Sequence, residues 1–117
     1  MPRTKGGYKT RQRRNRVLKR AKGFWGARRK LYAVAKETVD RAMAFAFVGR
    51  KLKKRSFRRL WITRINAASR PLDLSYSRLI DGLTKANVEL DRRILADLAV
   101  NDPTTFAAVA GVAKQSL

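Results

Sequence analysis

Positive charge is concentrated in the first part of this chain, and this limits what the chain can fold into. Of its 29 Lys and Arg residues, 24 precede Pro71, where the acidic residues are Glu37 and Asp40 alone, so this part carries +22. The remaining 47 residues contain five basic and six acidic groups and carry −1. Because like charges repel one another in a compact state, we expect the basic part to stay extended until a polyanion neutralises it.

The composition excludes several classes of function. The chain has no Cys and no His, so Cys/His zinc sites and Ser-His-Asp or Cys-His catalytic groups are ruled out. Three of the six acidic residues near the end are explained by helix caps or turns, and none accompanies a nucleophile or a glycine-rich phosphate loop. We therefore expect no catalytic residue, no metal, no cofactor and no small-molecule substrate.

Nothing in the sequence suggests a membrane protein or a targeting segment. The longest uncharged apolar run in the basic part, residues 42–48, is far shorter than the roughly 20 residues that span a bilayer. The start of the chain has no apolar segment typical of a signal peptide, and it lacks the Ser content of an organellar leader. The expected location is the cytoplasm.

The basic part is predicted to be helical after a flexible tail over residues 2–9, which contain two adjacent glycines and no apolar periodicity. Thr10 is a suitable N-cap for a helix over residues 11–22, and Gly23 is a suitable C-cap. This helix has only a thin apolar stripe, so we expect RNA contacts rather than packing to stabilise it. The stripe consists of Val17, Leu18 and Ala21.

A much longer helix is predicted over residues 27–69, which contain no proline. Gly49 interrupts the good helix formers and is where a kink would occur. The helix should end before Pro71, because proline disfavours helical geometry in the residue that precedes it. Its apolar residues form a narrow seam at helical spacing: Leu31, Ala35, Thr38, Ala42, Phe45 and Leu52.

The apolar face widens toward the end of that helix, where Phe57, Trp61 and Ile65 stand four apart, beside Leu60 and Ala68. Three shorter amphipathic helices follow, with Ser75, Asp91 and the pair Asp102-Pro103 as start signals. Their apolar residues are Tyr76, Leu79, Ile80 and Leu83, then Ile94, Leu95 and Leu98, then Phe106, Val109, Ala110 and Ala113. No segment alternates with the period of a strand.

The predicted fold is therefore all-α. Residues 1–57 form a long basic RNA-binding arm made of a helix, a turn and a long helix. Residues 58–117 form a compact C-terminal bundle, of a size that is only marginally stable alone.

Two clusters of basic residues indicate binding to RNA. The first has charges at every helical azimuth, which suits a helix surrounded by phosphates better than one lying on a flat surface. Arg outnumbers Lys by 18 to 11, which favours bidentate phosphate contacts and stacking. A solvated basic tail and an unpartnered basic face are the alternatives. The clusters are Arg11, Arg13, Arg14, Arg16, Lys19, Arg20 and Lys22, and then Arg50, Lys51, Lys53, Lys54, Arg55, Arg58 and Arg59.

Aromatic residues between glycines offer a second kind of contact. Phe24 and Trp25, next to Gly23 and Gly26, would stack on unpaired bases or, alternatively, would pin the junction between two helices. Trp61 belongs to the apolar set of the bundle, so we interpret it as a core residue rather than an RNA contact.

Four sequence strings resemble the bacterial-type family of large-subunit ribosomal protein number twenty. They are KGFWGAR at residues 22–28, FRRLWITRINAA at 57–68, SYS at 75–77 and DRRILADLA at 91–99. The resemblance runs along nearly the whole chain, and agreement over the twelve positions of the second string is too extensive for chance.

The resemblance implies a protein that binds large-subunit (23S-type) ribosomal RNA early in assembly and threads its arm into the RNA. Family members lie near ribosomal proteins thirteen and twenty-one, and in some bacteria the C-terminal domain represses translation of its own messenger. Together with the two clusters, the expected RNA-binding residues are Arg3, Lys5, Lys9, Phe24, Trp25, Arg28, Arg29, Lys30, Arg64, Tyr76 and Arg92.

One other function is an open alternative, and another fails on the apolar pattern. A DNA-compacting protein would bind duplex DNA as well as it binds folded RNA. A basic membrane-surface peptide would need a broader apolar stripe than this chain has.

Overall fold

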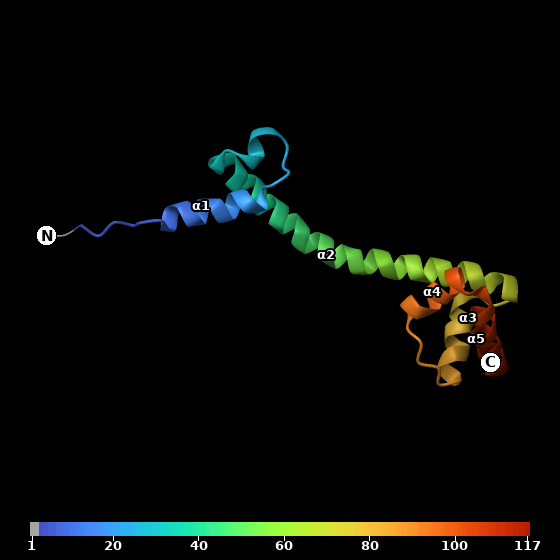
Figure 1. Cartoon of the computed structure of the whole chain (residues 1–117). Helices are drawn as coiled ribbons and strands as arrows, with labels where there is room; N and C mark the ends of the chain where they lie inside the picture. Colours follow the sequence, from blue (N-terminus) through green and yellow to red (C-terminus); the bar gives the residue numbers. More distant parts are fainter. Residues whose placement is uncertain (1–2) are drawn as a thin grey trace. The chain divides into compact units, whose positions relative to one another are not determined.

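The computed structural model describes residues 3–117 and confirms the all-α prediction (Figure 1). Within this range it contains five α-helices, two short 3-10 helices and no strand. Contacts divide the chain into two compact units, Met1–Lys51 and Leu52–Leu117, and the long helix α2 (Tyr32–Ser69) contributes to both. The functional division at residues 57 and 58 stays a prediction.

The first unit contains α1 (Lys9–Arg20), the 3-10 helix η1 (Gly26–Arg29) and the beginning of α2. The predicted caps of α1 were wrong, because Tyr8 occupies the N-cap position and Ala21 the C-cap position. Residues 3–6 have no regular structure, whereas Lys9, assigned above to the tail, is already helical. Gly23 lies beyond the helix end with a φ of 84°, a left-handed conformation that glycine adopts without strain.

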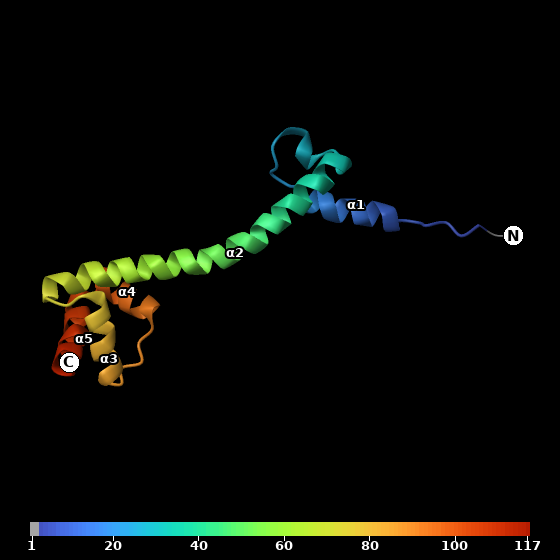
Figure 2. The ribbon, with the colours of Figure 1, turned by 180° about the vertical axis from the view of Figure 1, so that it is seen from behind.

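The expectation that α1 does not pack on protein was also wrong. Ala21 is completely buried against Ala35 and Val39 of α2, and Val17 and Leu18 pack around them. The contact is small and lies at the end of α1, and the charged side chains of α1 remain exposed on its other faces. Figure 2 shows α1 beside the first turns of α2. A stripe too thin for a large core is thus wide enough for a small one.

Helix α2 begins at Tyr32 rather than at residue 27, because the chain first makes the 3-10 helix η1, which begins at Gly26 with a φ of 59°. Helical structure continues through Gly49 without a break. The helix ends at Ser69 as predicted, and the 3-10 helix η2 (Arg70–Leu72) carries Pro71 just after that end.

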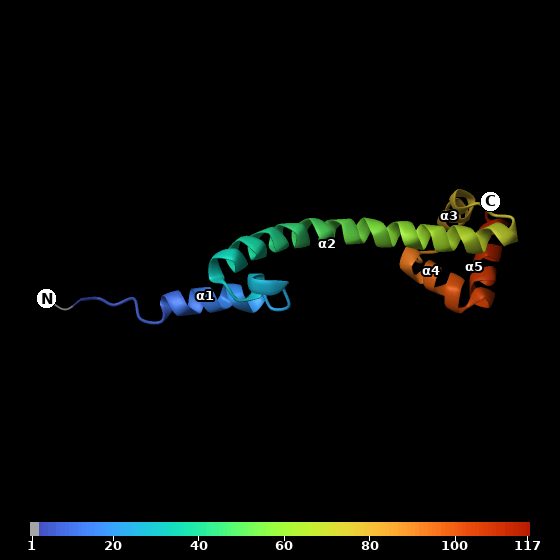
Figure 3. The same cartoon turned by 90° about the horizontal axis from the view of Figure 1, so that it is seen from above.

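The second unit contains the last part of α2 with α3 (Tyr76–Lys85), α4 (Arg92–Asn101) and α5 (Pro103–Gln115). All three predicted caps are confirmed: Ser75, Asp91 and Asp102 each accept a hydrogen bond from a backbone N–H three residues later. Figure 3 shows α3 on one side of the last turns of α2 and α4 on the other.

The core of this unit joins all four helices. Its buried residues are Ile65, Leu74, Leu79, Leu83, Leu95, Ala96, Phe106, Ala110 and Ala113. Trp61 and Ala68 are half-buried against this core, but Phe57 and Leu60 are 44% and 40% exposed, so the predicted apolar face of α2 is narrower than expected. Helices α3 and α5 are so close that a Cβ on Gly82 would lie 2.4 Å from the carbonyl oxygen of Ala113.

Candidate nucleic-acid interface

The first basic cluster covers α1 and the turn after it, and all seven of its side chains are exposed. Two of these arginines contact uncharged side chains, which do not neutralise them. The Arg14 guanidinium lies over the ring of Tyr32 at 5.2 Å, and Nη1 of Arg20 lies 3.2 Å from Sδ of Met43. These contacts orient the guanidinium groups and leave most of their N–H donors directed to solvent.

The second basic cluster lies on α2, and its seven side chains are exposed as well. Aromatic rings accompany two of its lysines. Nζ of Lys51 lies 4.4 Å from the ring centre of Phe47, and Nζ of Lys53 lies 5.9 Å from that of Phe57. Cation–π contacts of this kind are weak when exposed, so they bias the lysine positions without neutralising them.

Almost none of this charge is compensated by ion pairs within the described residues. Among residues 3–117 a single salt bridge is present, between Lys85 and Asp81 of α3 at 2.8 Å. The basic residues that precede Pro71 therefore make no ion pair in the described part of the chain. A surface with this much unpaired positive charge attracts polyanions and gains affinity by releasing their counterions.

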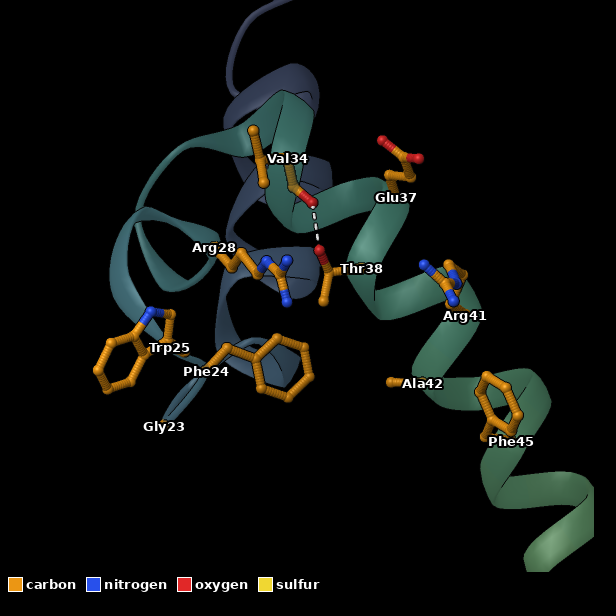
Figure 4. Close-up of a pocket in the computed structure, with 10 residues that line it drawn as sticks. All are labelled: Gly23, Phe24, Trp25, Arg28, Val34, Glu37, Thr38, Arg41, Ala42 and Phe45. Carbon is orange, nitrogen blue, oxygen red and sulfur yellow. Dashed lines mark hydrogen bonds between the residues drawn. The ribbon is translucent and has the colours of Figure 1, made fainter.

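A hollow of about 620 Å³ lies in the first unit, between the turn after α1 and α2. Figure 4 shows the Phe24 ring directed toward α2. Phe24 is half-buried against the small α1–α2 core, as the junction interpretation predicts, whereas Trp25 is 87% exposed. The residues that line the hollow are Gly23, Phe24, Trp25, Arg28, Val34, Glu37, Thr38, Arg41, Ala42 and Phe45.

Tyr76 and Arg92, which the sequence assigned separately to RNA binding, contact one another in the second unit. Nε of Arg92 donates a hydrogen bond to the Tyr76 hydroxyl at 2.6 Å. Both side chains are half-buried. The bond joins the beginnings of α3 and α4 and holds the guanidinium in one orientation, with its two terminal nitrogens remaining as donors.

A second hollow, of about 520 Å³, lies beside Trp61, where Arg64 of α2 and Arg93 of α4 both line it. Trp61 is thus a core residue on one side and lines a surface hollow on the other.

The structure adds two basic residues to the candidates from the sequence. Arg93 lines the second hollow and Arg41 lines the first. Neither belongs to a charge cluster in the sequence. Arg41 precedes Phe45 by four residues on α2, whereas only the folding of the chain brings Arg93 of α4 beside Trp61 of α2.

The remaining predicted residues lie in exposed positions. Arg3 and Lys5 precede α1, and Lys9 begins it. The run Arg28, Arg29 and Lys30 follows Trp25 in and just after η1, and Arg64 lies on α2.

Other kinds of site find little support in the described part of the chain. Residues 3–117 hold no group of acidic side chains suited to a metal ion. No helix there combines the length and apolar character that crossing a bilayer requires. The Asp102 carboxylate accepts hydrogen bonds from the Thr105 side chain and backbone, which lower its pKa, and this is explained by its role as a helix cap.

Comparison with known proteins identifies the family. A family model described as ribosomal protein L20 matches residues 3–109. The large ribosomal subunit protein bL20 of Geobacter metallireducens is 63% identical over 117 residues, covering 100% of both chains. Its counterpart in Citrifermentans bemidjiense is 64% identical over 114 residues, or 97% of each chain, and that in Pelobacter propionicus is 62% identical over 117 residues, or 100% of each. The resemblance in the sequence strings is therefore confirmed, and the chain belongs to the ribosomal protein L20 family.

Proposed function

We propose that this chain binds large-subunit ribosomal RNA directly, as a structural constituent of the large ribosomal subunit, and promotes early assembly of that subunit. The family consists of structural, non-enzymatic proteins of the cytoplasmic ribosome. The relatives named above are proteins of the large subunit. The finer claims, direct RNA binding and assembly, depend on the chain's own surface.

The unpaired charge of the first 70 residues is the observation that carries this proposal. Twenty-four cations face two acidic residues, and none of them makes an ion pair in the described structure. Neighbouring RNA helices repel one another through their phosphates, and a basic chain placed between them removes that repulsion. A protein of this kind allows RNA segments to approach one another, which is what assembly requires.

We further propose that the basic arm supplies affinity and that the compact bundle supplies site selection. The arm presents flexible cations, which contact phosphates of any sequence. In the bundle, the Arg92 guanidinium is fixed by Tyr76, and a fixed donor can discriminate between RNA shapes.

The test measures binding of the full chain to a large-subunit RNA fragment, an unrelated folded RNA and duplex DNA across a salt series. If about seven phosphates are contacted, the log–log slope with salt should be about −5 to −6. Replacing Arg11, Arg13 and Arg16 with Gln should flatten the slope by about 2 to 3. The matched control replaces three exposed cations outside the predicted set with Gln: Lys36, Arg78 and Lys114.

Preference for the large-subunit fragment at the highest salt would support direct and selective binding. Equal affinity for all three nucleic acids would contradict the proposal and favour the DNA-compacting alternative. An equal effect of the control would show that total charge, not the α1 surface, determines affinity.

Two further roles are proposals that come from the family resemblance. One is proximity to ribosomal proteins thirteen and twenty-one in the subunit. The other is repression of the chain's own messenger, which a reporter fused to that messenger's leader would test by its response to added protein.

A further inference from the structure

The hollow in the first unit has the size and lining of a ligand site, not of a packing defect. Its volume of about 620 Å³ falls within the range of about 300–1,000 Å³ typical of small-ligand pockets. Ala42 and Thr38 contribute small side chains on the α2 side, and the Thr38 hydroxyl is already bonded to the Val34 carbonyl at 2.8 Å. The Thr38 hydroxyl therefore needs no partner from within the hollow.

Three aromatic residues line this space, but the ring of Trp25 is turned away from α2 in Figure 4, so Phe24 and Phe45 are the two rings that face it. Phe24 comes from the turn after α1, and Phe45 comes from α2, with Ala42 between them in the view of Figure 4. Phe45 is 68% exposed, so it takes no part in the small α1–α2 core. Exposed aromatic rings bordering a hollow are suited to stacking on a flat apolar group.

The charged residues of the hollow select the chemistry of the occupant. Arg28 and Arg41 both line it, and neither makes an ion pair in the described structure. Glu37 also lines it and would repel a phosphate placed on its side. The lining thus suits a ligand with an anionic part near the arginines and a flat, uncharged part beside the aromatic rings.

An unpaired nucleotide has this combination of groups. We propose that the hollow receives one nucleotide extruded from the bound RNA, with its base against Phe24 and Phe45 and its phosphate on Arg28 and Arg41. This inference rests on the proposed function, since it requires RNA as the partner. A run of paired backbone would satisfy the arginines but would leave the ring of Phe45 and the open face of Phe24 without a stacking partner.

The test uses RNA hairpins that differ by one bulged 2-aminopurine nucleotide, whose fluorescence is quenched when the base stacks. The full chain should quench the bulged base and bind the bulged hairpin about tenfold more tightly than the fully paired one. Phe45→Ala should abolish most of this preference. Phe47→Ala is the matched control, because Phe47 is 55% exposed on the same helix but does not line the hollow.

The arginines are tested in the same way. Arg41→Ala should weaken binding to the bulged hairpin more than Lys36→Ala does, although each change removes one positive charge from α2. Because Phe45, Phe47, Arg41 and Lys36 are all exposed, the four variants should fold, which circular dichroism would verify.

A bulge preference that survives Phe45→Ala, or falls equally with Phe47→Ala, would overturn the inference. Equal effects of Arg41→Ala and Lys36→Ala would overturn the phosphate assignment. The salt series with the large-subunit fragment separates these results from the proposed function. If the inference fails in the hairpin assay but the Phe45→Ala variant still binds the large-subunit fragment selectively, only the nucleotide site is wrong. If the unmodified chain shows no selective binding to that fragment, the proposed function fails.

Discussion

Replacing Gly82 with Ala should destabilise the second unit, although the same change usually stabilises a helix. Glycine inside a helix costs about 1 kcal/mol relative to alanine, so propensity alone predicts a gain. However, the new Cβ would lie 2.4 Å from the carbonyl oxygen of Ala113, and 2.9 and 3.0 Å from its carbonyl carbon and Cα. These are backbone atoms, which cannot rotate away as a side chain can, so α3 and α5 must separate.

Overpacking of a tight core typically costs about 1–3 kcal/mol, and a clash with backbone belongs at the upper end of that range. After subtracting the gain in propensity, we expect Gly82→Ala to lower the free energy of unfolding by about 1–2 kcal/mol. In a unit of this size, each kcal/mol lowers the melting temperature by about 4–8 °C.

Gly111 provides the matched control, because it lies inside α5 of the same unit and a Cβ there would meet nothing within 4 Å. Gly111→Ala should therefore stabilise the unit by up to about 1 kcal/mol. Urea unfolding of the full chain, followed by Trp61 fluorescence in a Trp25→Phe background, measures both changes. Trp25 is 87% exposed, so its replacement removes no core contact. A Gly82→Ala variant at least as stable as the unmodified chain would refute the close-packing argument.

Three further predictions concern the same unit. Phe106→Ala should lower the free energy of unfolding by about 3–5 kcal/mol and leave the unit largely unfolded, because that ring is 2% exposed. The unfolding transition followed by Trp61 fluorescence should then be largely absent. Tyr76→Phe should cost about 1 kcal/mol in the same assay, because Nε of Arg92 loses its acceptor. The pKa of Asp102 is lowered below its ordinary 3.8 by hydrogen bonds from Thr105, so its contribution to stability is present above pH 3.8 and is lost as the pH falls through the lowered value. The stability advantage over Asp102→Asn should shrink across that window, and an advantage that stays constant with pH would contradict the assignment.

The long-range features of the site could not be predicted from the sequence. The stripe of Val17, Leu18 and Ala21 looked too thin to pack. Ala35 was assigned to the apolar seam of the long helix, but nothing in the sequence indicates that this seam, with Val39, meets the stripe. The same reasoning explains why Arg41 escaped notice: it belongs to no charge cluster and gains its significance only beside the hollow.

By itself, the sequence determined the segregation of charge, the helical class of the fold and the three caps of the bundle. These features depend on composition or on residues within one turn of each other, as with Asp102 and the N–H of Thr105. Only the tertiary structure decided that α1 packs on α2, that Gly82 allows α3 to meet α5, and that Tyr76 orients Arg92. Each of these contacts joins residues far apart in the chain, and their energies come from the burial and geometry that folding creates, which local propensity does not contain.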